Sequence, residues 1–136
     1  MLYYLDTCIW LNFINKEEPF DKIAKNFLIN ISNKDKIIIS TIILKELENK
    51  LGKEKFKIIE KFFNNKGNII LIKTINSDYI NARVLENSIR FEISFYDCLH
   101  IVISKRLNCT LITRDKELIK IAEEYISVWK PEDLLS

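Results

Sequence analysis

The chain has 136 residues, of which 48% are hydrophobic and 29% are charged, and this composition is typical of one ordinary globular domain. Its 21 basic and 19 acidic side chains give a formal net charge of +2, so the charge neither requires nor excludes a polyanionic partner. Only 2 Gly and 2 Pro are present, which argues against a low-complexity linker. We therefore expect residues 1–136 to form a single domain.

Three cysteines, Cys8, Cys98 and Cys109, are odd in number and far apart, as is usual for reduced thiols in the cytosol. No apolar run approaches the roughly 18 residues needed to span a bilayer. The amino terminus lacks the positively charged segment of a secretory signal. These features predict a soluble, cytoplasmic protein that does not associate with membranes.

Short apolar runs alternate with helical patterns along the chain. We predict strands and helices in this order: strand 2–5, helix 8–14, helix 20–31, strand 36–40, helices 41–51 and 54–63, strand 68–73, helix 77–89, a helix that starts after residue 94, strand 109–112, helix 116–125 and strand 126–129. Nearly continuous apolar strands separated by helices predict a parallel sheet covered on both faces, an α/β/α sandwich.

One helix has clear signals at both ends. Ser94 is placed as its N-cap, with Asp97 three residues later as in a capping box. Asn108 stands where a left-handed residue ends many helices, and Asn tolerates that conformation.

Four acids are predicted near one edge of the sheet. Asp6 ends the first strand and Asp115 follows the fourth, Glu46 lies on the second turn after the second strand, and Asp97 begins a helix. Ligands of open α/β sheets bind beyond the carboxyl ends of the strands. Each acid also has a structural explanation, as a helix cap for Asp6, Asp97 and Asp115 or a solvated helix residue for Glu46. Capping alone does not require four acids at one edge, so the set predicts a site.

Clustered carboxylates repel one another unless a cation or protons neutralise them. Oxygen ligands without Cys or His favour Mg²⁺ or Mn²⁺ over zinc. A divalent ion held in this way can activate water and stabilise a phosphoryl transition state, so phosphodiester hydrolysis is the expected chemistry. His100, one turn after Asp97, is interpreted as a structural histidine because a single histidine does not make a zinc site.

The segments 5–7, 45–47, 94–97 and 111–115 resemble, in order and spacing, the acidic motifs of PIN-domain nucleases, most closely the VapC-type toxins of toxin–antitoxin systems. The resemblance implies a five-stranded sheet of order 3-2-1-4-5 and Mg²⁺- or Mn²⁺-dependent cleavage of RNA. It also implies an antitoxin protein partner and a homodimer. The resemblance assigns roles to specific residues: metal ligands and catalytic groups Asp6, Glu46, Asp97 and Asp115, and supporting hydroxyls Thr7 and Thr113.

Two basic residues adjoin these acids, Lys45 and Arg114, and either could contact an RNA phosphate, although solvation is the safer interpretation of both. Phosphoreceiver domains and haloacid-dehalogenase-like phosphatases also place acids at strand ends. Both fit poorly, since neither Thr7 nor Cys8 supplies the second acid that they need near the first strand.

Two alternatives stay open. One is a housekeeping RNA-processing nuclease without a toxin role. The other is a PIN-fold interaction module, to which the aromatic residues Trp10, Phe13, Phe20 and Phe27 could supply an apolar contact surface, although core packing is the default for aromatics at helical spacing.

Overall fold

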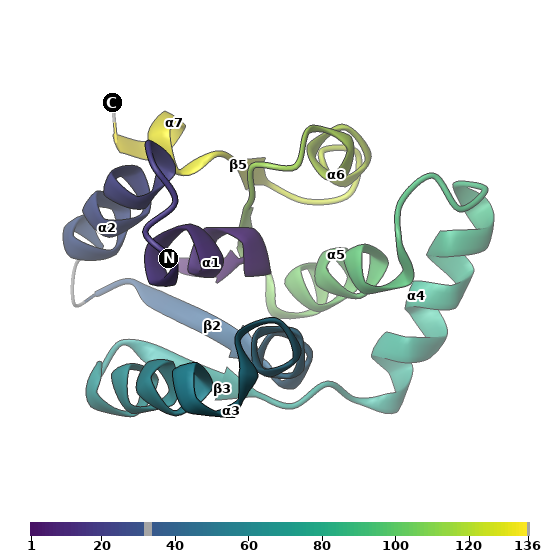
Figure 1. The fold of residues 1–136 in the computed structure, drawn as a ribbon. Coiled ribbons are helices and arrows are strands. Elements are labelled where there is room, and N and C mark those ends of the chain that lie inside the picture. The colour runs from purple at the N-terminus through teal and green to yellow at the C-terminus, as the bar shows by residue number, and fades with distance from the viewer. Residues whose placement is uncertain (32–33, 136) are drawn as a thin grey trace.

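The computed structural model describes residues 1–31 and 34–135, which form five strands and seven helices. The strands are β1 (Leu2–Leu5), β2 (Lys36–Ser40), β3 (Ile69–Ile72), β4 (Thr110–Ile112) and β5 (Val128–Trp129). The helices are α1 (Thr7–Ile14), α2 (Phe20–Asn30), α3 (Thr41–Asn65), α4 (Asn76–Ser88), α5 (Phe95–Leu107), α6 (Lys116–Ala122) and α7 (Pro131–Leu135). Every strand pair is parallel, and the strand order is β3-β2-β1-β4-β5 (Figure 1).

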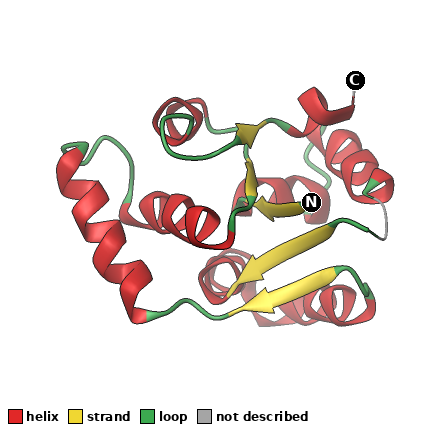
Figure 2. Ribbon diagram, turned by 180° about the vertical axis from the view of Figure 1, so that it is seen from behind, coloured by secondary structure: helices red, strands yellow, loops and turns green. Residues whose placement is uncertain are grey.

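The order of the strands explains the layers. The chain runs from β1 outward to β3 through α1, α2 and α3, then returns through α4 and α5 to β4 on the far side of β1. Crossovers between parallel strands are right-handed. When the chain turns back across the sheet after β3, the helices that follow therefore lie on the face opposite α1 and α3. Helices α1 and α3 lie in front of the strands in Figure 1, and the strands lie in front of them in the reverse view of Figure 2. The predicted α/β/α sandwich and the strand order are confirmed.

The predicted break within residues 41–65 is confirmed, whereas α6 and α7 differ most from the prediction. Helix α3 consists of two helices joined by a kink at Gly52, whose φ of 80° and ψ of 166° are not helical, and this agrees with the separate helices predicted at 41–51 and 54–63. Helix α6 ends at Ala122, where the Ala122 carbonyl accepts from the amides of both Tyr125 and Ile126 and so tightens the last turn. Helix α7 was not predicted, although Pro131 is its first residue and proline favours that position.

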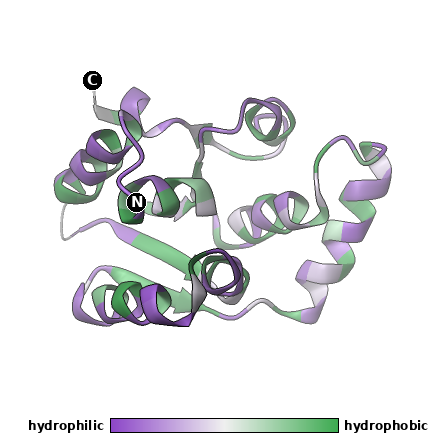
Figure 3. Ribbon diagram, viewed as in Figure 1, coloured by the Kyte–Doolittle hydropathy of each residue, from purple (hydrophilic) through white to green (hydrophobic). Residues whose placement is uncertain are grey.

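The core lies between the sheet and its helices. The β2 segment is hydrophobic along most of its length in Figure 3, and Ile37, Ile38 and Ile39 are at most 3% exposed. Of the four aromatic residues considered for a contact surface, Trp10 and Phe27 lie in this core, at 0% and 3% exposed. Phe13 is half-buried and Phe20 is 40% exposed, so these four residues do not form one apolar surface.

The longest helix is α3, with 25 residues, and it carries many charges. None of the helices in the described ranges is both long and apolar enough to cross a membrane.

Both ends of α5 are as predicted. The Ser94 hydroxyl accepts a hydrogen bond from the Asp97 amide at 3.1 Å. Asn108 ends the helix in the left-handed conformation, with φ 55° and ψ 46°. Arg106 also donates two hydrogen bonds to the buried Asp78 carboxylate, at 2.8 and 2.9 Å, and so ties α5 to α4. These contacts fix the helix that carries Asp97.

The left-handed conformation at Asn108 leads to a stability prediction. Asn108→Ala should lower the free energy of unfolding by about 1 kcal/mol, because a Cβ without a locally bonding amide is disfavoured there. Asn26→Ala, the same change at an exposed position inside α2, should instead raise it by roughly 0.5 kcal/mol, since Ala is the better helix former. Urea unfolding of both variants measures the effect. Equal changes in the free energy of unfolding would show that the left-handed conformation of Asn108 does not affect stability.

Candidate active site

The site forms where three strands end side by side. Leu5 of β1 pairs with Ile112 of β4, and Ser40 is the last residue of the neighbouring β2. The next residues, Asp6 and Thr113, therefore emerge together at the carboxyl edge of the sheet. Both are buried, at 7% and 0% exposed.

Asp6 is held by groups from two strand ends. One carboxylate oxygen accepts from the Thr7 amide at 2.7 Å and caps α1. The other accepts from the Thr113 hydroxyl at 2.8 Å and from the Cys8 thiol at 3.5 Å. The Asp6 side chain therefore caps α1 and at the same time lies at the carboxyl edge of the sheet, as both predictions required.

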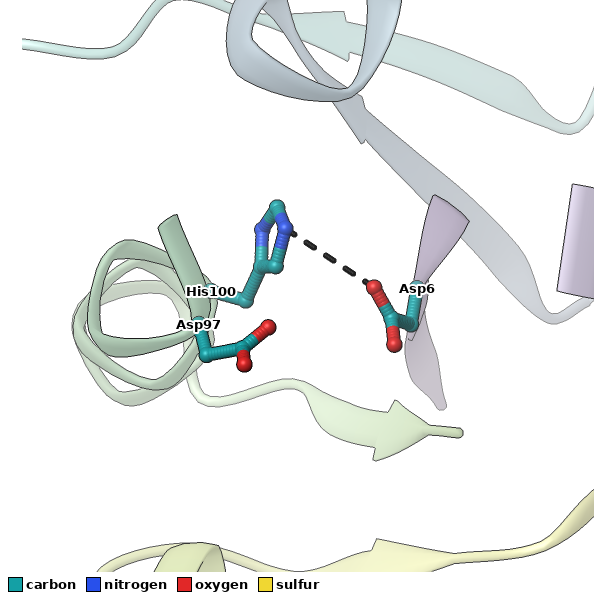
Figure 4. A group of neighbouring side chains, drawn as sticks. All are labelled: Asp6, Asp97 and His100. Carbon is teal, nitrogen blue, oxygen red and sulfur yellow. Dashed lines mark ion pairs between the residues drawn. The ribbon is translucent and has the colours of Figure 1, made fainter. Parts of the chain in front are cut away.

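Asp97 and His100 reach Asp6 from α5. The two residues are one turn apart, and both side chains point from that helix toward the end of β1 (Figure 4). Ligand atoms of Asp6, Asp97 and His100 all lie within 4.8 Å of one another, and the His100 Nε2 to Asp6 Oδ1 distance is 3.8 Å. This is the only such group of potential metal ligands in the described part of the chain.

Glu46 joins the cluster from α3. Its Oε1 accepts from His100 Nε2 at 2.9 Å and from the Thr7 hydroxyl at 3.1 Å. Glu46 therefore contacts His100, which belongs to the group, and Thr7, which follows Asp6 in the chain, so its carboxylate lies at the same edge of the sheet.

Asp115 lies at the rim of the cluster. Its Oδ1 accepts from the amides of Glu117 and Leu118 and caps α6. Its own amide donates to the Thr113 hydroxyl at 3.2 Å, and that hydroxyl donates to Asp6. Asp115 is exposed and reaches the other acids through this shared threonine.

The cluster makes Asp97 hard to ionise. Burial, followed by repulsion from Asp6 and then Asp115, raises the pKa of Asp97 from 3.8 to about 6, although the charge of His100 opposes the shift. The charges of Asp6 and Asp115 both act on Asp97, as expected for carboxylates that lie near one another.

His100 and Glu46 shift each other in opposite directions. Burial by itself would lower the pKa of His100, but the hydrogen bond to Glu46 and the charges of Asp6, Glu46 and Asp97 raise it. Burial would raise the pKa of Glu46, but the hydrogen bonds from His100 and Thr7 and the charges of His100 and Lys50 lower it. Glu46 is thus favoured in its ionised form.

The donor set fits a divalent cation. Ligand atoms of Asp6, Asp97 and His100 lie within 4.8 Å of one another. A bound cation would stabilise the ionised form of Asp97, which burial and the charge of Asp6 disfavour. Carboxylate oxygens suit Mg²⁺ and Mn²⁺.

The two basic residues next to the acids differ in their surroundings. Lys45 is exposed beside Glu46 on α3. The Arg114 guanidinium instead forms paired 2.9 Å contacts with Glu132 and stacks 4.2 Å from the centre of the Phe20 ring. The Arg114 guanidinium is therefore already paired with other residues of the chain.

His100 is the residue that sequence reasoning placed outside the site. Its ring nitrogens contact Glu46 and Tyr4, both at distances below 3 Å, and it is fully buried. A signal was present, because a residue three positions after Asp97 lies on the same face of the helix. The partners Tyr4 and Ser40 had no such signal.

Comparison with known proteins supports the geometry. The sequence profile of the PIN domain matches residues 3–124. The chain therefore belongs to the PIN domain family, as its motifs suggested. No curated protein sequence matches it.

Solved structures of low sequence identity share the fold. VapBC2 from Rickettsia felis, bound to a DNA fragment from its promoter, superposes with a TM-score of 0.73 and 23% identity over 96% of this chain and 98% of that chain. VapBC-1 from nontypeable Haemophilus influenzae gives 0.71 and 19% over 97% and 99%. VapC20 from Mycobacterium tuberculosis, a toxin that cleaves the Sarcin-Ricin loop, gives 0.71 and 14% over 87% and 93%. The architecture is thus that of VapC proteins.

The raised pKa of Asp97 predicts a pH-dependent effect of Asp97→Asn in EDTA. The wild-type protein takes up a proton at Asp97 on folding between about pH 4 and 6, so this carboxyl favours folding at low pH and opposes it above pH 6. The variant should therefore gain stability over the wild type as the pH rises from 4 to 8, by about 2 kcal/mol. Chemical unfolding at a series of pH values measures this difference. A stability difference that does not change with pH would contradict the raised pKa of Asp97.

Proposed function

We propose that the protein is a metal-dependent endoribonuclease in which Asp6, Glu46, Asp97 and Asp115 form the catalytic site. The observation that carries the proposal is the convergence of these acids, from four separate segments, on one partly buried edge of the sheet. Membership of the PIN domain family supports the same chemistry.

Asp6 and Asp97 would hold the ion, with Glu46 and Asp115 contributing directly or through water. A bound Mg²⁺ or Mn²⁺ would supply an activated water and offset the negative charge of the phosphoryl transition state. Thr113 orients one Asp6 oxygen and Thr7 orients Glu46, which limits the freedom of both carboxylates.

RNA would approach from the exposed side of the cluster. Lys45, which is exposed and adjacent to Glu46, is available for a phosphate contact. Arg114 is the weaker candidate, since its guanidinium would first have to leave Glu132.

Cleavage of a mixed RNA pool tests the activity. Wild-type protein should cut with Mg²⁺ or Mn²⁺ and not in EDTA. Asp6→Asn and Glu46→Gln should each lower the rate by roughly 100-fold or more, the scale of losing one electrostatic contribution to a transition state. Asn caps helices as well as Asp does, so α1 should persist in the first variant.

Glu48→Gln is the matched control, because Glu48 is an exposed acid on the same helix as Glu46. It should cut like the wild type. If the folded wild type binds metal but cuts no RNA, the protein is an interaction module with a PIN fold.

We further propose that the protein is the cytoplasmic toxin of a type II toxin–antitoxin system, with an antitoxin protein as partner. The structural likeness to VapC and VapBC proteins supports this role. A homodimer is also proposed, and exposed apolar side chains on α4, Ile80 and Val84 at 63% each, offer a surface for it.

Expression in a bacterial host distinguishes a toxin from a housekeeping nuclease. Induction of the wild type should arrest growth, whereas Asp6→Asn expressed at the same level should not, because the arrest depends on cleavage. Normal growth with an enzyme that is active in vitro would favour the housekeeping role.

A further inference from the structure

A buried chain of hydrogen bonds runs behind the acidic cluster. The Ser40 hydroxyl lies 2.7 Å from the Tyr4 hydroxyl, which lies 2.7 Å from His100 Nδ1. On the other side of the ring, Nε2 lies 2.9 Å from Glu46 Oε1. Ser40, Tyr4 and His100 are each 0% exposed, so the chain connects β2, β1 and α5 to a carboxylate on α3 without access to solvent.

The direction of donation follows from the carboxylate. Ionised Glu46 can only accept, so His100 Nε2 donates to it. In the neutral ring Nδ1 then accepts from the Tyr4 hydroxyl, and the Tyr4 oxygen accepts from Ser40. The Ser40 oxygen also accepts from the Ile43 amide at 3.2 Å, so every group in the chain has a partner.

Glu46 needs such support more than Asp6 does. Asp6 is a short side chain at a strand end and is held by Thr7 and Thr113. Glu46 is longer, projects from the second turn of α3, and loses more rotamer freedom when fixed. Buried partners of a metal ligand supply this orientation.

We propose that His100 is a positioning residue which, with Tyr4 and Ser40 behind it, holds the Glu46 carboxylate at the edge of the group formed by Asp6 and Asp97, where it can contribute to metal binding. This role rests on the proposed function, since it assigns Glu46 to the ion. It differs from the interpretation of His100 as a purely structural histidine, because the histidine acts on the site through one carboxylate.

The test measures Mn²⁺ affinity by electron paramagnetic resonance, together with RNA cleavage and melting temperature in EDTA. Tyr4→Phe removes only the hydroxyl that supports Nδ1 and should weaken Mn²⁺ binding about tenfold, within the range for outer partners of metal ligands. The matched control is Tyr3→Phe, the same change on the opposite face of β1, where Tyr3 packs edge-on against Phe27. It should bind Mn²⁺ like the wild type.

Two variants of His100 test whether Glu46 needs the hydrogen bond from this position or the imidazole ring itself. His100→Gln keeps a nitrogen near the place of Nε2 and should retain much of the affinity. His100→Ala keeps none and should lose up to about 100-fold. If His100→Ala does not fold, Tyr4→Phe and His100→Gln still decide the question.

A double variant tests whether the effect passes through Glu46. In a Glu46→Gln background, Tyr4→Phe should weaken Mn²⁺ binding no further, because the carboxylate that the chain positions is already absent. Additive losses would overturn the role of His100 as a positioning residue for Glu46.

Two outcomes distinguish failure of this role from failure of the function. Mn²⁺ binding and cleavage that are unchanged in Tyr4→Phe and His100→Ala would overturn the role of His100 and leave the nuclease intact. A folded wild type that binds no Mn²⁺ would overturn both.

Discussion

The repulsion between carboxylates at the end of the central strands is the constraint on which the site depends. Asp6 follows β1, and Asp97 meets it from the first turn of α5, in a place where burial already disfavours charge. Such an arrangement is stable only when the charge is offset by a proton, a cation or a nearby imidazole. Burial, followed by the charge of Asp6, raises the pKa of Asp97, and His100 lies 3.8 Å from Asp6, where its charge opposes that shift.

The parallel sheet is what brings the acids together. Its strands all run in one direction, so β1, β2 and β4 deliver Asp6, Ser40 and Thr113 to the same edge. The helices that follow or cross this edge then add Glu46, Asp97 and Asp115. Four segments far apart in the chain supply one site because their connecting elements are fixed by burial of apolar strands.

Several residues of the candidate site combine an observed structural role with a proposed functional one. Asp6 and Asp115 cap α1 and α6, and Ser40 caps α3 while it supports Tyr4. A helix cap fixes the position of a side chain at the start of a rigid element, which also suits a metal ligand. The structural and functional explanations of these residues are therefore compatible, and neither one argues against the other.

The sequence by itself determined the fold class, the strand order through its motifs, and the acidic residues of the candidate site. Apolar periodicity and caps are local signals, so the strand at residues 36–40 and the left-handed Asn108 could be read directly. The roles of His100, Tyr4 and Ser40 were decided only by the tertiary structure, because residues 4, 40 and 100 meet through strand pairing and helix packing. The pairing of Arg114 with Glu132 was likewise decided only by the tertiary structure, since a charged side chain does not specify its partner until the chain has folded.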